Sequence, residues 1–504
     1  MVMVSIKSWQ QQIGKAIAQV DMALCKRLIA RLDVKGSKLI KGIRFEGLRV
    51  IGDPWEAAFR YAQAGADELL YVDVVASLYG RNGLVDLLRR TSREVFIPIT
   101  AGGGVRSVSD AAALLAAGAD KIAVNTSALQ RPELITELAE AFGRQCVVAS
   151  IQARRIGPQS WEAMTEAGRE RSGRDVLAWI ETVQELGAGE ILLTSIDQDG
   201  TCKGPDLELQ QAAASIARVP LVLGGGFAQV QEVTQALANP AVGAVSIAAA
   251  LHHSKLDLAE LKHQLAAGPE HLPIRQALAS TADASMTPAT RPLLGQQIGV
   301  IDYGMGNQQS LINALEQLGA TTVLSGEPEK LAGCALLALP GVGAFPQGMA
   351  ELHQRGLDQF LRQWVASDRP LLGICLGMQM LFEVGEEYGQ TAGLGLIQGT
   401  VRPLPANDAS GHPLILPHMG WNRLLPGDAW THDEAPDTQN QYFVHSYAAT
   451  DVNPQTVLFT CRYGHLPFVA AVKQGSVVGF QFHPERSGPN GLQLLAQTCR
   501  ELLA

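Results

Sequence analysis

The chain has 504 residues, of which 47% are hydrophobic and 18% charged, and its formal net charge at pH 7 is −9. This length predicts two large domains or three smaller ones, and the composition excludes a low-complexity chain. The negative charge argues against a nucleic-acid partner, because no global positive field would attract one. Seven cysteines occur without a C-x-x-C pair, and no apolar run is long enough to span a membrane. We therefore expect a reducing, cytoplasmic location, no membrane partner, no disulfide framework, no metal and no cofactor.

Residues 1–22 carry an apolar side chain at every third or fourth position, among them Trp9, Ile13 and Ile17. This period predicts an amphipathic helix. We expect this N-terminal extension to pack on the protein itself or on a second copy of it, and a membrane surface is the alternative.

Residues 23–265 alternate short β-branched runs with helical stretches. Such alternation is typical of βα units around a parallel sheet, and eight units in a segment of this length predict an α/β fold of the (βα)8 TIM barrel type. The eight runs begin at Arg27, Glu68, Val95, Lys121, Cys146, Glu190, Pro220 and Gly243.

Two stretches of the barrel segment repeat. The sequence around Glu68 resembles that around Glu190, and the Gly102-Gly-Gly triplet resembles Gly224-Gly-Gly at the same offset. This predicts a barrel of two half-barrel repeats. Each triplet ends a strand, where bare backbone N–H groups can approach a phosphate closely. Two triplets therefore predict a substrate with a phosphate at each end, and tight turns without a ligand are the alternative.

Residues 266–296 lack clear periodicity and are rich in proline, which predicts a linker. A different pattern fills residues 297–504, where apolar runs such as Leu336–Leu339 and Leu371–Ile374 lead into glycine loops. We expect an open α/β domain there.

Gly373-Ile-Cys375-Leu-Gly377 has the G-x-nucleophile-x-G form of a nucleophile elbow. The flanking glycines allow a strained turn, and a thiol at the start of a helix is favoured as the thiolate. A cysteine nucleophile needs a base and a group that orients the base. His483-Pro-Glu485 supplies both, so Cys375, His483 and Glu485 are the predicted catalytic triad.

These two motifs resemble those of class I glutamine amidotransferases. Further stretches narrow the resemblance to the glutaminase subunit of imidazole glycerol phosphate synthases, namely Asp302–Asn307, Pro340–Gly343, Pro417–Asn422 and Tyr442–Tyr447. The barrel segment resembles the cyclase subunit of the same enzymes, in Leu32–Lys35, Gly102–Ser107, Val124–Thr126 and Leu193–Thr201. The two resemblances together imply a fused synthase with the cyclase first and a class I glutaminase domain second.

The resemblance implies that Cys375 attacks the glutamine amide and releases ammonia, while the N–H of Leu376 and the backbone at Val342 and Gly343 bind the oxyanion. The residues implied to hold glutamine are Gln379, Glu387, Tyr442, His445 and Ser446. Ammonia would enter the barrel through a ring of charges at its base, formed by Arg27, Glu68, Lys121 and Glu190. The docked domains would share a salt bridge between Asp120 and Lys473.

The implied substrate of the barrel is a phosphoribulosyl-formimino aminoimidazole carboxamide ribotide with two phosphates. The product would be imidazole glycerol phosphate, in histidine biosynthesis. The residues implied to bind the substrate are Lys41, Gly103, Gly104, Asn125, Thr126, Asp199, Gly200, Gly225, Gly226 and Ala248. Ala249 stands where the family usually has serine, so one hydroxyl contact is lost, and Gly224 replaces another serine of the family's Ser-Gly-Gly loop.

One departure from the family is larger. Asp33 matches one of two aspartates that the family uses as general acid and base, but Gln152 stands where the second belongs, and a carboxamide cannot transfer a proton. Either another group, with Asp199 the nearest by motif, covers that role, or the barrel does a different job. It would then deliver ammonia to another acceptor, such as a sugar on a partner enzyme, or only activate the glutaminase.

Overall fold

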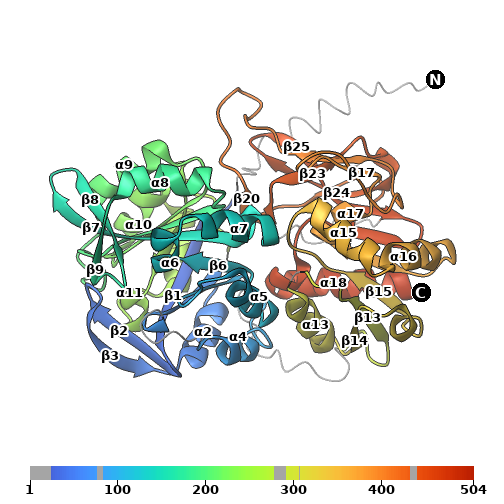
Figure 1. The fold of residues 1–504 in the computed structure, drawn as a ribbon, viewed down its shortest axis with the longest axis horizontal. Helices are drawn as coiled ribbons and strands as arrows, with labels where there is room; N and C mark the ends of the chain where they lie inside the picture. Colours follow the sequence, from blue (N-terminus) through green and yellow to red (C-terminus); the bar gives the residue numbers. More distant parts are fainter. Residues whose placement is uncertain (1–23, 77–82, 277–290, 306, 432–439) are drawn as a thin grey trace.

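The computed structural model describes residues 24–76, 83–276, 291–305, 307–431 and 440–504. Two domains lie side by side in it, a barrel drawn in blue to green and an α/β domain drawn in yellow to red (Figure 1). The amphipathic helix predicted for residues 1–22 lies outside the described residues. In the described part of the chain, no helix is long and apolar enough to cross a membrane.

The first domain is a closed barrel of eight parallel strands, as predicted. In the order of pairing, the strands are β10 (Glu190–Ser195), β11 (Leu221–Gly224), β12 (Val242–Ile247), β1 (Arg27–Lys35), β4 (Glu68–Asp73), β5 (Ile99–Gly102), β6 (Lys121–Val124) and β7 (Val147–Gly157). Pairing of β7 with β10 closes the barrel. The helices of this domain are α2 (Pro54–Gln63), α4 (Val85–Thr91), α5 (Val108–Ala116), α6 (Thr126–Gln130), α7 (Glu133–Phe142), α8 (Val176–Glu185), α9 (Leu207–Ile216), α10 (Val230–Leu237), α11 (Ala249–His252) and α12 (Leu258–Ala267).

Two antiparallel hairpins, which the alternation of runs did not predict, extend the barrel strands. β2 (Lys38–Ile43) and β3 (Glu46–Gly52) follow β1, and β8 (Ser160–Thr165) and β9 (Glu170–Asp175) follow β7. A second difference concerns the run that begins at Val95, because β5 starts only at Ile99. Pro98 directly before it has no N–H to give to a sheet.

The side chains of β1 that point into the barrel alternate along the strand, as its period of two requires. Arg27 lies at the base, Ile29 above it, and Arg31 and Asp33 line a cavity at the mouth. Ile29 belongs to an apolar layer to which seven of the strands each contribute one residue, the others being Leu70, Ala123, Val148, Leu192, Val222 and Ala244. This layer separates the charged base from the mouth.

The second domain is built on a mixed sheet. Its strand order is β14 (Thr321–Ser325), β13 (Gln297–Ile301), β15 (Leu336–Leu339), β16 (Leu371–Ile374), β26 (Val477–Phe480), β25 (Leu466–Gln474), β24 (Val457–Tyr463) and β21 (Leu425–Pro426). The first five are parallel. Its helices are α13 (Gln308–Gln317), α14 (Pro328–Leu331), α15 (Phe345–Gln354), α16 (Leu357–Ala366), α17 (Leu376–Met380) and α18 (Gly488–Leu503).

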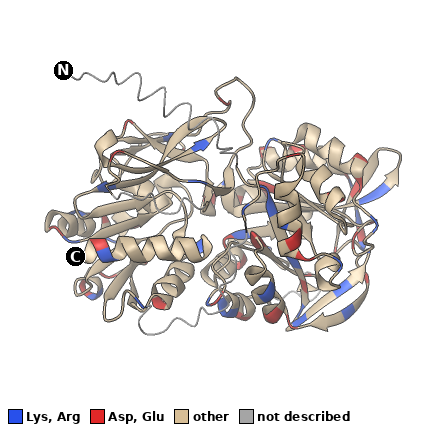
Figure 2. Cartoon of the chain, turned by 180° about the vertical axis from the view of Figure 1, so that it is seen from behind, with Lys and Arg blue, Asp and Glu red and all other residues tan. Residues whose placement is uncertain are grey.

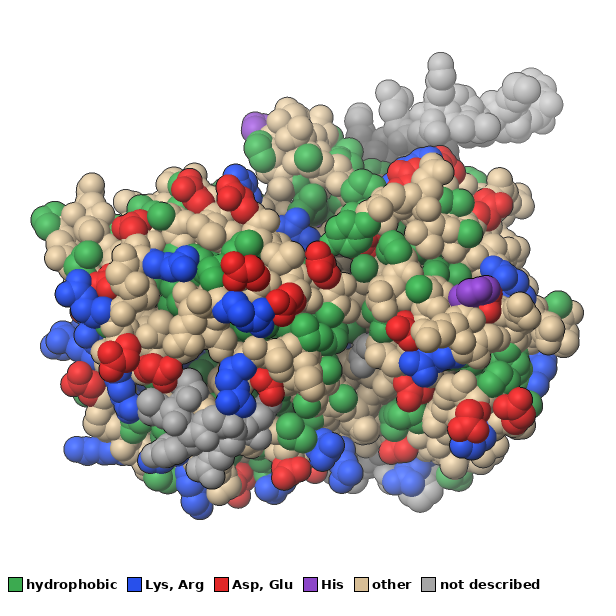
Figure 3. Space-filling view, viewed as in Figure 1, with side chains coloured by type: hydrophobic (Ala, Val, Ile, Leu, Met, Phe, Trp, Pro, Cys, Tyr) green, Lys and Arg blue, Asp and Glu red, His purple; other side chains and the backbone are tan. Residues whose placement is uncertain are grey.

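A two-stranded sheet of β20 (His418–Asn422) and β22 (Gln441–His445) faces the barrel. Trp421 of β20 is buried, and its indole N–H donates to the Asp67 carbonyl of the barrel at 3.1 Å. Arg275, from the segment predicted as linker, pairs with the Asp67 carboxylate at 2.7 Å and lies 4.1 Å from the centre of the Trp421 ring. The start of this segment therefore packs between the two domains. Basic and acidic residues are interspersed along the ribbon of both domains (Figure 2), and their side chains are likewise interspersed on the face that Figure 3 presents.

Candidate active sites

Cys375 lies in a sharp turn between β16 and α17. Its backbone has φ 54° and ψ −110°, a left-handed conformation that is strained for a residue with a side chain. Its N–H donates to the Phe480 carbonyl at 2.7 Å. At Gly377 an added Cβ would come within 1.8 Å of the Leu339 carbonyl oxygen, so only glycine lets the helix begin this close to β15.

His483 directly precedes the 3-10 turn η4 (Pro484–Arg486), which follows β26, and Glu485 lies within that turn. His483 Nδ1 lies 2.7 Å from Glu485 Oε1, so the ring donates from Nδ1 and leaves Nε2 as the basic atom. Nε2 has no hydrogen-bond partner among the described residues. Burial alone would lower the pKa of His483, but Glu485 and Cys375 beside it raise that pKa well above its ordinary value. Cys375, His483 and Glu485 line one pocket, which brings the predicted triad together.

The predicted oxyanion donors are not all available. The N–H of Leu376 donates to the Gly341 carbonyl at 3.3 Å, so a carbonyl of the Pro340–Gly343 loop takes one of the two predicted donors. Val342 of the same loop lines the pocket. An added Cβ at Gly343 would meet Met305 at 2.5 Å and the Ala141 carbonyl of the barrel at 3.7 Å. Gly343 therefore lies next to the boundary between the two domains.

Of the residues predicted to hold glutamine, only Tyr442 lines the triad pocket, and its buried hydroxyl has no partner among the described residues. Gln379 donates to the Tyr447 carbonyl, and His445 contacts the same carbonyl through Nδ1. Glu387 accepts the Phe345 N–H at 2.7 Å, and burial raises its pKa. The Ser446 hydroxyl oxygen is buried without a described partner.

Gln481, which the sequence motifs did not single out, contacts Cys375. Its Oε1 accepts from Gln379 at 3.0 Å, which turns Nε2 toward Cys375 Sγ at 3.8 Å. The only signal in the sequence is its position two residues before His483.

The triad pocket is walled by both domains. Asp120, Gln145 and Cys146 of the barrel line it together with Cys375 and His483. A ligand bound beside Cys375 would therefore lie against the base of the barrel.

Four buried charges form a closed ring at that base. Arg27 pairs with Glu68 at 2.8 Å and also with Glu190, while Lys121 pairs with Glu68 at 2.8 Å and with Glu190 at 2.6 Å. All four side chains are at most 1% exposed. Such burial is tolerated because each charge has two partners of opposite sign. Met419 of β20 covers the ring, with Sδ 3.6 Å from Lys121 Nζ.

The predicted salt bridge between Asp120 and Lys473 is wrong. Asp120 Oδ1 accepts from Arg486 Nε and from Asn307 Nδ2, both at 2.9 Å. Lys473 pairs with Glu501 of its own domain at 3.7 Å and is 39% exposed. Arg486 reaches Asp120 instead because it ends the η4 turn at the domain boundary, where it also donates to the carbonyls of Val95, Ile97 and Gly118.

A large cavity opens at the other end of the barrel. Asp33 lies in its wall, where its two carboxylate oxygens accept from Arg31 Nε and Lys41 Nζ, each at 2.8 Å. Burial alone would raise the pKa of Asp33, but Arg31 and Lys41 hold it well below its ordinary value. Lys41 also bonds both oxygens of Asp199, at 3.1 and 2.9 Å.

The two glycine loops lie in neighbouring hollows. Gly103, Gly104, Asn125 and Thr126 line the large cavity, and Gly200, Gly225, Gly226 and Ala248 line a smaller one. Arg31 and Asp199 line both. Gly103 and Gly226 pack against backbone, since an added Cβ would come within 2.4 Å of the Asp73 carbonyl and 2.0 Å of the Gly204 carbonyl, respectively.

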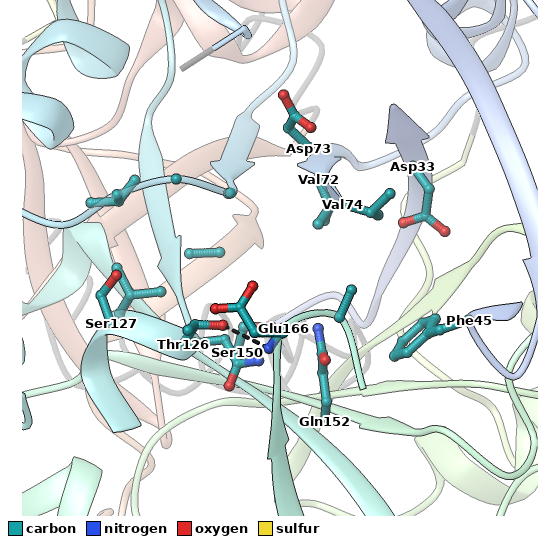
Figure 4. A pocket seen from close by; sticks show the side chains of 18 of the residues that line it. Asp33, Phe45, Val72, Asp73, Val74, Thr126, Ser127, Ser150, Gln152 and Glu166 are labelled. Carbon is teal, nitrogen blue, oxygen red and sulfur yellow. Dashed lines mark hydrogen bonds between the residues drawn. The ribbon is translucent and has the colours of Figure 1, made fainter. Parts of the chain in front are cut away.

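Gln152 lies in the wall of the large cavity, apart from Asp33 across the open space (Figure 4). Its side-chain oxygen is buried and has no hydrogen-bond partner among the described residues. Arg31 and Glu166, which the sequence motifs did not single out, line the same cavity. Within the described ranges no group of three or more His, Cys, Asp and Glu side chains is placed to hold a metal ion.

Comparison with known proteins assigns the two domains of the chain to two different families. Residues 27–257 match the family of histidine biosynthesis proteins, and residues 299–502 match the class I glutamine amidotransferases. The barrel is 55% identical over 206 residues to imidazole glycerol phosphate synthase subunit HisF of Legionella pneumophila, which covers 41% of this chain and 97% of that protein. The same subunit of Synechococcus sp. (strain CC9902) is 48% identical over 247 residues, covering 48% of this chain and 96% of that protein.

Proposed function

The chain belongs to the imidazole glycerol phosphate synthase family, and we propose that it makes imidazole glycerol phosphate with ammonia that its own second domain releases from glutamine. The observation that carries this proposal is the shared pocket, in which Cys375 and His483 face Asp120 and Cys146 of the barrel base. Ammonia released there is next to the barrel and its charged ring.

In the glutaminase domain, His483 takes the proton of the Cys375 thiol and the sulfur attacks the amide carbon of glutamine. His483 returns the proton to the leaving ammonia, and water then clears the thioester. Leu376 can stabilise the oxyanion only after the Gly341 carbonyl leaves its N–H. Binding of the second substrate to the barrel is the event that we expect to shift this loop, since Gly343 lies next to the barrel helix α7, where an added Cβ would come within 3.7 Å of the Ala141 carbonyl oxygen.

Ammonia then passes from the triad pocket into the barrel. The ring of Arg27, Glu68, Lys121 and Glu190 leaves no charge unpaired and must part to admit it. Above the ring the apolar layer around Ile29 offers neutral ammonia a path that disfavours ammonium. Asp33, Lys41 and the two glycine loops bind the bis-phosphorylated ribotide at the mouth.

The similarity over nearly the whole length of the cyclase subunits favours this function over a barrel that only activates the glutaminase or serves another acceptor. The test supplies the purified chain with glutamine and the ribotide, and measures glutamate and imidazole glycerol phosphate together. We expect both products in equal amounts. Cys375→Ala should abolish the use of glutamine while leaving product formation from ammonium, and glutamate release without ribotide turnover would refute the synthase function.

A further inference from the structure

The barrel has a carboxylate at its mouth that no family motif assigns. Adding ammonia to the substrate and expelling an amine requires a group that accepts a proton and gives it back. Asp33 is held between two cations, and both oxygens of Asp199 are bonded to Lys41. Gln152 has no titratable proton. The acid–base role that falls to the position of Gln152 therefore needs another carboxylate, and the bonds of Asp199 to Lys41 tie up both of its oxygens.

Glu166 is a carboxyl group in the same cavity, and no cation among the described residues pairs with it. It lies in the turn between β8 and β9, and Figure 4 shows its carboxylate pointing into the cavity beside Thr126. Gln152 pairs with Met164 across β7 and β8, so the turn folds back over the position of Gln152. The Glu166 Oε2 atom is buried and has no hydrogen-bond partner among the described residues. A buried carboxylate oxygen without a partner costs free energy unless a ligand satisfies it.

The turn that carries Glu166 is strained and firmly held. Glu166 and Ala167 have φ of 50° and 53°, and Gly168 follows at 80°. Left-handed backbone costs about 1–3 kcal/mol for each residue with a side chain and persists where surrounding contacts impose it. Here the Thr126 hydroxyl accepts the Glu166 N–H at 3.0 Å, and Arg154 donates to the Gly168 carbonyl at 2.9 Å. These bonds hold the backbone of the turn from which the Glu166 side chain projects.

We propose that Glu166 is the second acid–base residue of the barrel and does the work of the carboxylate that Gln152 lacks. This inference rests on the proposed function. Ammonia that adds to the substrate carbon becomes an ammonium group, and the Glu166 carboxylate takes one proton from it. The bond between that carbon and the leaving amine then breaks with its electron pair going to nitrogen. Protonated Glu166 gives the proton to this nitrogen, so the residue ends as it began.

Gln152 keeps a role in binding. Its buried carboxamide oxygen can accept a hydrogen bond from an N–H or O–H of the substrate on the same side of the cavity as Glu166. Glu166 moves the proton, and Gln152 positions the group that receives it.

The test uses the whole chain with ammonium and the ribotide, which bypasses the glutaminase. Glu166→Gln keeps the shape of the side chain and removes its proton chemistry. We expect kcat to fall by about 100- to 10,000-fold, KM to change far less, and one limb of the pH–rate profile to disappear. Adding Gln152→Asp to this variant should restore part of kcat and bring back a pH limb. Glu170→Gln, an exposed carboxyl at the start of β9, is the matched control and should change nothing.

The midpoint of thermal unfolding, measured on each variant, separates loss of chemistry from loss of fold. A Glu166→Gln chain that unfolds like the wild type and keeps both kcat and the pH profile would overturn the inference alone. A wild-type chain that gives no product from ammonium and ribotide would overturn the proposed function, and the role of Glu166 with it.

Discussion

Replacement of Arg486 by methionine tests the corrected docking contact. The guanidinium is 1% exposed and donates to Asp120 and to three barrel carbonyls. Methionine keeps the apolar stem and leaves Asp120 buried without a cation. Breaking a buried ion pair by removing one partner costs about 3–5 kcal/mol. Asp120 keeps its bonds to Asn307 and to the Ile99 N–H, so we expect a value near the lower end of that range.

The matched control is Lys473→Met. The pair of Lys473 with Glu501 spans 3.7 Å, and its side chains are 39% and 36% exposed. Exposed pairs contribute about 0–1 kcal/mol, so this variant should behave nearly like the wild type. The assays are urea unfolding and the ratio of glutamine-driven to ammonium-driven product formation. Arg486→Met should lower both the free energy of unfolding and this ratio. The docking contact that we describe would be refuted if Arg486→Met left the stability unchanged while Lys473→Met lowered it.

The same variant has a pH signature. Burial is the main cause of the raised pKa of Asp120, and Arg486 opposes it. Without Arg486 the folded-state pKa rises further above the ordinary 3.8. A raised carboxyl pKa means that the folded state binds protons more tightly, so stability falls as pH rises through the folded value. The difference in free energy of unfolding between the wild type and Arg486→Met should therefore become smaller at acidic pH.

Three further predictions concern the glutaminase and the ring. Glu485→Gln should lower glutaminase kcat by about 100- to 10,000-fold. Because the pKa of His483 is raised in the folded state, the stability that the pair of His483 and Glu485 contributes is complete below pH 6.5 and is lost as pH rises through the folded-state pKa. The free energies of unfolding of wild type and variant should therefore converge at high pH. Gly377→Ala forces a 1.8 Å contact and should destabilise the domain by several kcal/mol, whereas Gly333→Ala meets nothing within 4 Å and should leave the urea midpoint unchanged. Lys121→Met leaves two buried glutamates with one cation and should cost about 3–5 kcal/mol in urea unfolding, and an unchanged midpoint would contradict the closed ring.

Much of the fold was predictable, because each strand of a parallel barrel is a local apolar run. The run at Val95 misled because its residues are buried without pairing in the sheet. Val95 and Ile97 belong to the barrel core, and their carbonyls accept from Arg486, while Phe96 packs against the core of the second domain. Local sequence does not distinguish burial in a sheet from burial in an interface.

The residues of the candidate sites also differ in whether the sequence alone could predict them. Cys375, His483 and Glu485 stand in short motifs whose spacing carries their chemistry, so the sequence alone pointed to them. Glu166 reaches the mouth only because the hairpin after β7 folds back, and nothing in its neighbours marks that return. The partner of Asp120 depends on the relative placement of two domains, which one-dimensional patterns do not contain.

The contact between Arg486 and Asp120 joins parts of one polypeptide, and this changes what its loss would do. Two domains on a single chain meet at an effective concentration on the order of millimolar, so a docking surface weakened by a few kcal/mol would still be occupied for much of the time. Since Arg486 follows Glu485 directly, brief undocking would disturb the catalytic turn before it separated the domains. A weakened interface should therefore show itself as glutamine hydrolysed out of step with product formation, in a ratio that does not vary with protein concentration.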